Sequence, residues 1–158
     1  MSAGSYIGLC LLGTVVFYAV KLYLDEESLM MSEYEDMLAF LFHARKSVSS
    51  FLMTPEEICA SFEAKTAALR CFTERFSRSE KDGFFEKSRM MQSDKDMLKR
   101  YFSKFGMSGY DCETEELGAV CKDFEARVVK LREESKKSRK LIPVICVFAF
   151  VSLILLLL

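Results

Sequence analysis

Residues 114–131, TEELGAVCKDFEARVVKL, contain the pattern that decides the fold of this chain. Apolar residues recur there at steps of three, four, four and three, at Leu117, Val120, Phe124, Val128 and Leu131. These steps align the side chains along one stripe of a helix, and such a stripe is typical of coiled-coil packing. We therefore expect a long helix that starts near Thr114 and packs against other helices through this stripe.

Two helices are predicted upstream from their start signals. Ser32 and Glu35 have the spacing of a capping box. Apolar residues follow at helical spacing, at Tyr34, Met37, Leu38, Leu41, Val48 and Leu52. Thr54 and Pro55 suit the N-cap and first position of a second helix, which should run into the seventies and end at the stretch SEKDG. Its inward side chains would be Ile58, Phe62, Leu69, Phe72 and Phe76.

A short apolar segment and a further helix complete the middle of the chain. Phe84 and Phe85 open the segment, and Ser93 or Asp94 can cap the helix behind it. The apolar residues of this helix are Met97, Leu98, Tyr101, Phe102 and Phe105. Gly106 fits the position after its end, where a left-handed backbone costs glycine least. Because the period-two alternation of strands is missing, the chain is predicted to be all-α, with a single helical-bundle domain.

Both ends of the chain are strongly apolar. Neither residues 2–20 nor residues 141–158 contain a charged residue. Since roughly 20 apolar residues span a bilayer as a helix, we predict transmembrane helices at 1–24 and 141–158, flanking the helical domain at 25–140. A cleaved signal peptide would need cations before its apolar run, whereas here the first cation follows it. A buried C-terminal helix is the alternative for the second segment, but such helices rarely have apolar side chains on every face.

Cations predict the orientation of the two spans. Lys21 follows the first span, and a basic group precedes the second, at Lys136, Lys137, Arg139 and Lys140. Because Lys and Arg near membrane ends are retained on the cytoplasmic side, the central domain should be cytoplasmic and both termini should lie outside the cytoplasm. Residues 132–140 lack apolar side chains and would form a helical spacer of roughly 13 Å. The same cations can bind anionic lipid.

Charge and motif content argue against several classes of function. All 23 acidic residues and all but one of the 22 Lys and Arg residues lie within 25–140, so no basic excess indicates nucleic-acid binding. The six cysteines include no C-x-x-C pair, and the only histidine, His43, has no carboxylate at a metal-ligand spacing. No phosphate-binding loop or nucleophile motif is found. We therefore predict no enzymatic activity, no cofactor and no bound metal.

The order of these parts resembles the stage III sporulation protein AB family along nearly the whole chain. The most specific stretch is the loop Phe105, Gly106, Met107 and Ser108, followed by the charged helix and the apolar C-terminal span. Members of that family usually have Leu-Gly-x-Ser-Asp in this loop, whereas this chain has Gly109 at the Asp position and Glu113 near the position where Gln is common. The Trp that many relatives carry in the short helix is also missing, and Phe84 or Phe85 would fill its space.

The resemblance implies a function. It indicates a mother-cell membrane component of the channel that endospore-forming bacteria build between mother cell and forespore. The helical domain would be similar to the platform protein of type II secretion systems and would dock a cytoplasmic secretion-type ATPase and other channel subunits. A membrane-anchored helical scaffold or adaptor for division or envelope assembly is the alternative. Whether the chain forms homo-oligomers stays open.

A partner surface is expected at the end of the domain far from the membrane. Both membrane-proximal ends are occupied by charged segments, and helix direction predicts that the connections at 51–57 and 106–116 meet at the far end. Their carboxylates are the candidate partner-binding residues, Glu56, Glu57, Asp111, Glu113, Glu115 and Glu116. The alternative is that these residues only complement the positive ends of two helices.

Overall fold

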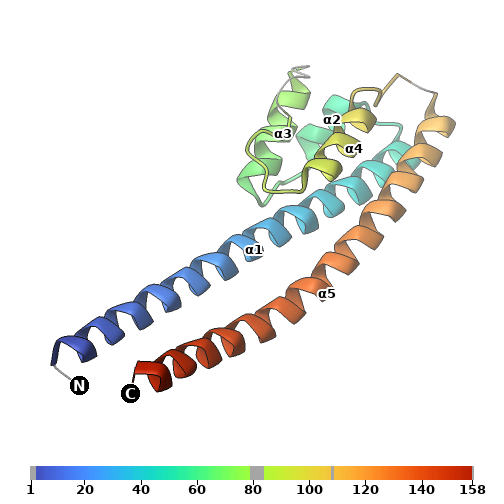
Figure 1. The fold of residues 1–158 in the computed structure, drawn as a ribbon. Coiled ribbons are helices and arrows are strands. Elements are labelled where there is room, and N and C mark those ends of the chain that lie inside the picture. Colours follow the sequence, from blue (N-terminus) through green and yellow to red (C-terminus); the bar gives the residue numbers. More distant parts are fainter. Residues whose placement is uncertain (1–2, 79–83, 108, 158) are drawn as a thin grey trace. The chain divides into compact units, whose positions relative to one another are not determined.

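The computed structural model describes residues 3–78, 84–107 and 109–157, and all of its regular structure in these ranges is helical (Figure 1). The helices are α1 (Ala3–Phe51), α2 (Pro55–Ser61), α3 (Ala67–Ser77), α4 (Gln92–Phe102) and α5 (Tyr110–Leu157). The all-α prediction is confirmed. The predicted helix end at residues 79–83 and the loop residue Ser108 lie outside the described residues.

The chain forms two compact units. One unit is Leu29–Lys130, and the other consists of Met1–Ser28 together with Leu131–Leu158. Helices α1 and α5 each contribute to both units, whereas α2, α3 and α4 belong to Leu29–Lys130 alone.

Aromatic rings fill much of the core of Leu29–Lys130. The Phe72 ring lies 4.9–5.7 Å from five other rings, those of Phe40, Phe76, Phe84, Phe85 and Phe102. Most predicted inward residues are buried, including Tyr34, Met37, Leu41, Val48, Ile58, Leu69, Leu98, Phe105, Leu117, Phe124, Val128 and Leu131. Others are only half-buried, namely Leu38, Phe62, Phe76, Met97, Tyr101 and Val120.

The buried stripe of α5 differs from the prediction at one position. Cys121 is buried, whereas Val120 is only half-buried. The stripe therefore runs through Leu117, Cys121, Phe124, Val128 and Leu131. Its steps of four, three, four and three are those of a regular heptad seam. Cys121 acts as a small apolar filler, and burial raises the pKa of its thiol.

The predicted helix start at Ser32 is wrong. Helix α1 runs without a break from Ala3 to Phe51, and Ser32 is exposed in its interior. Inside a helix, each backbone N–H bonds the carbonyl four residues earlier, so Ser32 and Glu35 have no free amides to cap. The prediction for Leu52 is also wrong, because this residue is 59% exposed and has a φ of 51° just beyond the helix end.

The prediction of one helix from Pro55 into the seventies is wrong as well, because residues 62–66 separate α2 from α3. Thr66 caps α3, its Oγ1 accepting a hydrogen bond from Leu69 N at 3.3 Å. Asp36 Oδ2 on α1 accepts from Thr66 N at 2.8 Å and from Lys65 N at 3.0 Å. A buried carboxylate of another helix therefore stabilises this start, and local sequence patterns do not show such a contact.

Helix α4 also starts differently from the prediction. Its N-cap is Met91, without a side-chain cap, and the predicted caps Ser93 and Asp94 lie inside the helix. Phe84 and Phe85 are buried in a turn before it. The start predicted for α2 is confirmed, because Thr54 caps this helix in a complete capping box with Glu57. Gly106 has the predicted left-handed φ, at +83°, but the predicted helix end there is wrong, because α4 ends at Phe102 with Ser103 as its C-cap.

The unit made of Met1–Ser28 and Leu131–Leu158 carries many exposed apolar side chains. Phe17, Phe148 and Leu155 are each at least 70% exposed. Where the structure describes both backbone and side chains, no helix is sufficiently long and apolar to cross a membrane. Several residues of each predicted span lie outside that part of the chain.

Candidate functional site

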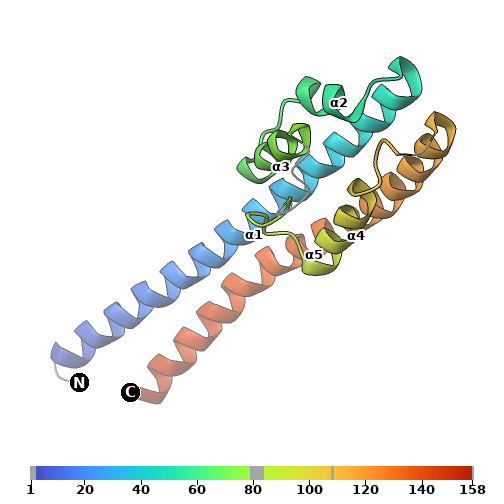
Figure 2. The same ribbon diagram turned by 90° about the horizontal axis from the view of Figure 1, so that it is seen from above.

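The connections after α1 and before α5 meet at one end of Leu29–Lys130. Tyr110 Oη donates a 3.3 Å hydrogen bond to the Leu52 carbonyl oxygen, and Gly106 packs against the Pro55 ring. Figures 1 and 2 both place the end of α1, the start of α2 and the start of α5 at this end. The two connections that carry the predicted partner-binding carboxylates are therefore neighbours.

Gly106 is required by two features of its position. Its φ is +83°, and a Cβ there would lie 2.6 Å from Pro55 Cγ, much closer than van der Waals contact allows. Its N–H donates a 2.6 Å hydrogen bond to Glu113 Oε1. In the loop motif, Phe105 is buried, and the glycine lets the backbone approach Pro55 at the start of α2. This part of the motif is thus structural.

Glu113 is not a surface residue, which corrects its place among the partner-binding candidates. It is only 7% exposed, and its carboxylate is occupied by the Gly106 N–H. The sequence signal was present, since Glu113 lies in the first turn of α5, where a side chain can reach backward to a loop amide.

The other five candidate carboxylates are exposed: Glu56, Glu57, Asp111, Glu115 and Glu116. Glu57 also has a structural role, because its Oε2 accepts a 2.8 Å hydrogen bond from Thr54 N in the capping box of α2. Asp111 lies in the first turn of α5, where a negative charge complements the helix dipole. The structure therefore brings exposed carboxylates of α2 and α5 to the same end of the unit.

Sequence reasoning missed the exposed apolar side chains on the same two connections as these carboxylates. Phe51, Leu52, Met107 and Tyr110 are between 50% and 70% exposed, and we call this group the tip surface. Leu52 and Met107 are hidden from pattern analysis for different reasons. Leu52 continues the apolar spacing of α1 but turns away from it through its positive φ, and Met107 lies in a loop without periodicity.

Buried carboxylates elsewhere in Leu29–Lys130 hold its helices together. Glu33 Oε2 accepts hydrogen bonds from Arg89 N at 2.7 Å and Ser88 Oγ at 2.9 Å. Asp94 lies at the centre of a second group, in which Tyr34 Oη donates to Oδ2 at 2.6 Å and Arg127 Nε donates to Oδ1 at 2.8 Å. Burial, with the hydrogen bond to Asp94, raises the pKa of Tyr34 well above its usual range. Glu33 therefore joins α1 to the segment before α4, and Asp94 joins α4 to α1 and α5.

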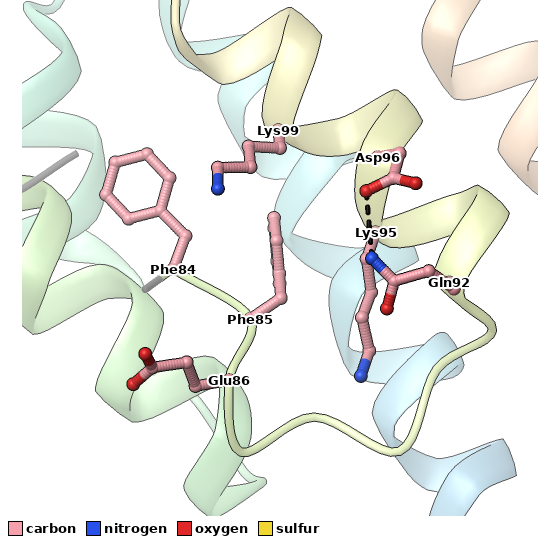
Figure 3. A pocket seen from close by; sticks show the side chains of 7 residues that line it. All are labelled: Phe84, Phe85, Glu86, Gln92, Lys95, Asp96 and Lys99. Carbon is pink, nitrogen blue, oxygen red and sulfur yellow. Dashed lines mark hydrogen bonds between the residues drawn. The ribbon is translucent and has the colours of Figure 1, made fainter. Parts of the chain in front are cut away.

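A shallow pocket of about 240 Å³ lies between the turn at Phe84 and α4 (Figure 3). Its charged side chains are two lysines, Lys95 and Lys99, and two carboxylates, Glu86 and Asp96. Gln92 donates to Asp96 at 2.9 Å, and Glu86 pairs with Arg75 at 3.4 Å. The pocket is balanced in charge and open to solvent, so its lining does not define a ligand class.

The basic group of α5 and His43 are the other residues singled out from the sequence. The basic group of Lys136, Lys137, Arg139 and Lys140 is exposed on α5. His43 Nε2 lies 2.9 Å from Ser61 Oγ, and its ring contacts Phe62. Among the described residues, no three His, Cys, Asp or Glu side chains are placed to hold a metal ion.

Comparisons of the chain with protein-family models, curated proteins and solved structures found no match.

Proposed function

We propose that the chain is a non-enzymatic membrane platform subunit of a sporulation channel resembling a secretion system. Its central unit would face the mother-cell cytoplasm and dock a secretion-type ATPase. The order of segments and the loop at Phe105 and Gly106 support this proposal through their resemblance to the stage III sporulation protein AB family.

One structural observation carries the proposal further than the resemblance. The buried carboxylates of Leu29–Lys130 brace this unit from inside. Glu33 and Asp36 bind α1 to the segments before α4 and α3, and Asp94 binds α4 to α1 and α5. Five exposed carboxylates and the tip surface lie on the two connections at one end of this unit. A body braced in this way, with exposed apolar side chains and carboxylates on two neighbouring connections, suits a docking platform.

Membrane anchoring is supported by the side chains at the other ends of α1 and α5. Large apolar residues are exposed there, including Leu11, Val15, Phe17, Val144, Val147 and Phe148. Contact with lipid would remove these side chains from water, at about 25 cal/mol for each Å² buried. The basic group at 136–140 would lie at the cytoplasmic surface, where anionic lipids attract it.

The topology is tested by thiol labelling in intact cells. An engineered cysteine at Ser2 should react with a membrane-impermeant maleimide, whereas the exposed native Cys112 should react only after permeabilisation. The unmodified chain is the control for the remaining cysteines. Reaction of Cys112 in intact cells would place the central unit outside the cytoplasm and overturn the proposal.

The platform role is tested by affinity purification of the tagged full chain from sporulating cells. The secretion-type ATPase and other channel subunits should co-purify. Recovery of division or envelope-assembly proteins without the ATPase would favour the scaffold alternative instead.

A further inference from the structure

The tip surface holds the most exposed large apolar side chains of Leu29–Lys130. Among the described residues of this unit, Met107 at 70%, Phe51 at 66% and Leu52 at 59% exposure rank highest. Tyr110, at 50%, joins them through its hydrogen bond to the Leu52 carbonyl. Isolated exposed apolar residues are normal, but a group drawn from two connections that contact each other marks an interaction site.

Leu52 is held in a backbone conformation that its side chain does not favour. Its φ of 51° is left-handed, which costs a non-glycine residue free energy, and its side chain gains little burial in return. Two hydrogen bonds hold the conformation, from Tyr110 Oη to Leu52 O and from Met53 N to Ser47 O. Glycine is usual at such helix ends, so the leucine side chain has a use outside the folded unit.

Charge around the tip surface is mostly negative. Residues 45–57 and 104–116 contain six carboxylates and three cations, Arg45, Lys46 and Lys104. Five of these carboxylates are exposed, because only Glu113 is buried. An apolar centre with an acidic rim complements a partner that carries apolar side chains flanked by Lys or Arg, and it repels anionic lipid and acidic proteins.

We propose that the tip surface docks a basic amphipathic segment of another protein. Apolar side chains of that segment would cover Phe51, Leu52 and Met107, the last of which can adapt its flexible thioether to them. Lys or Arg residues would pair with the rim carboxylates Asp111, Glu115 and Glu116. The inference goes beyond the proposed function, since it names the chemistry of the partner segment without requiring an ATPase.

The test is photo-crosslinking of the full chain in the cells that produce it. The photoreactive residue p-benzoylphenylalanine would replace Met107, and in a separate strain Phe51. A matched control would carry it at Val129, which is 50% exposed but lies on α5 away from the two connections. Mass spectrometry of the crosslinked peptides should identify a partner segment with an apolar face and an excess of Lys and Arg at both tip positions, and not at Val129.

Two variants separate docking from folding. Leu52→Gly removes the apolar side chain and relieves the left-handed strain, so the fold should be kept while crosslinking at Met107 falls. A double charge reversal, Glu115→Lys with Glu116→Lys, should lower the crosslinking yield by about five-fold. The exposed Glu125 on the same helix is the charge-matched control, and Glu125→Lys should leave the yield unchanged.

Four results would overturn the inference: equal crosslinking at Met107 and Val129, crosslinks to lipid, crosslinks to a second copy of this chain, or a partner segment without excess positive charge. Failure of the proposed function is distinguishable from these outcomes. A basic segment from a protein other than an ATPase would leave the docking inference standing and remove the proposed partner. Co-purification of the ATPase without crosslinks at the tip surface would support the proposed function and overturn the docking inference.

Discussion

Tyr34 Oη donates a 2.6 Å hydrogen bond to Asp94 Oδ2, and this bond joins the middle of α1 to the first turn of α4. The same hydroxyl accepts a 3.0 Å hydrogen bond from Met91 N, and the Tyr34 ring stacks on Phe124 of α5 with centroids 5.6 Å apart. Arg127 completes the group from α5, with its guanidinium 2.7 Å from Asp94 Oδ1. Three helices are therefore connected through one buried carboxylate.

The Tyr34 hydroxyl should contribute to stability, whereas the Tyr101 hydroxyl should not. Tyr34→Phe removes a hydrogen bond to a charged acceptor and leaves Met91 N without its partner, so it should lower the free energy of unfolding by about 1.5–3 kcal/mol. The Tyr101 hydroxyl is buried and has no hydrogen-bond partner among the described residues. Tyr101→Phe should therefore be neutral or stabilising. Amide hydrogen exchange of the full chain in mild detergent measures both effects, and equal losses would contradict the assigned hydrogen bonds.

The two loop glycines should respond differently to alanine. Position 106 has a positive φ, and the Cβ added by Gly106→Ala would lie 2.6 Å from Pro55 Cγ. The substitution should therefore destabilise Leu29–Lys130 by more than about 1 kcal/mol. Gly109 has no atom within 4 Å of an added Cβ and no positive φ, so Gly109→Ala should be neutral or slightly stabilising. Urea titration of each variant, followed by circular dichroism, checks the difference. A harmless Gly106→Ala would mean that the loop does not pack on α2.

Truncation of a buried phenylalanine should cost much more folding stability than truncation of an exposed one. Phe72 is fully buried among five other rings, and Phe72→Ala should cost about 3–5 kcal/mol. Phe42 is 42% exposed on α1, and Phe42→Ala should cost less than about 1 kcal/mol. Urea titration of both variants, followed by circular dichroism, measures the two costs. Small and similar costs would show that the aromatic cluster is not packed as described.

Alkaline pH should destabilise the fold through buried acids that stay protonated. Burial, with the nearby Glu56 carboxylate, raises the pKa of Cys59 from 9.0 to about 12. Above pH 9 the unfolded thiol loses its proton while the folded thiol keeps it, so the unfolded state binds fewer protons and stability falls as pH rises. The contribution is fully present below pH 9 and is lost progressively up to about pH 12.

Unfolding free energies at pH 7.5, 9 and 10.5 measure this loss. Cys59→Ala removes the titrating thiol, so this variant should lose less stability across the same interval, although it is less stable at pH 7.5. Cys112→Ala is the control for the removal of a thiol, because Cys112 is exposed. A Cys59→Ala variant with the full alkaline loss would assign the effect to other groups, such as the buried Tyr34.

Local patterns were sufficient for the all-α fold class and for the start of α2. The apolar spacing of residues 114–131 predicts most of the α5 stripe, because side chains three and four residues apart share a helix face in any context. Thr54, Pro55 and Glu57 predict the start of α2, since every atom of a capping box belongs to one short segment. Gly106 likewise predicts a left-handed backbone at its own position. Such features are stabilised by contacts within a few residues, so the sequence by itself determines them.

Only the tertiary structure decided the features that depend on distant partners. The break between α2 and α3 needs Asp36, about 30 residues upstream of Thr66 along the chain, and Asp94 is buried because Tyr34 and Arg127 approach it from other helices. Ser32 resembles a helix start locally, yet its amides are already bonded within α1. The tip surface exists because Leu52 turns outward and Tyr110 reaches its carbonyl from α5. A polar or apolar side chain takes its role from the groups that fold against it, and sequence spacing does not specify those groups.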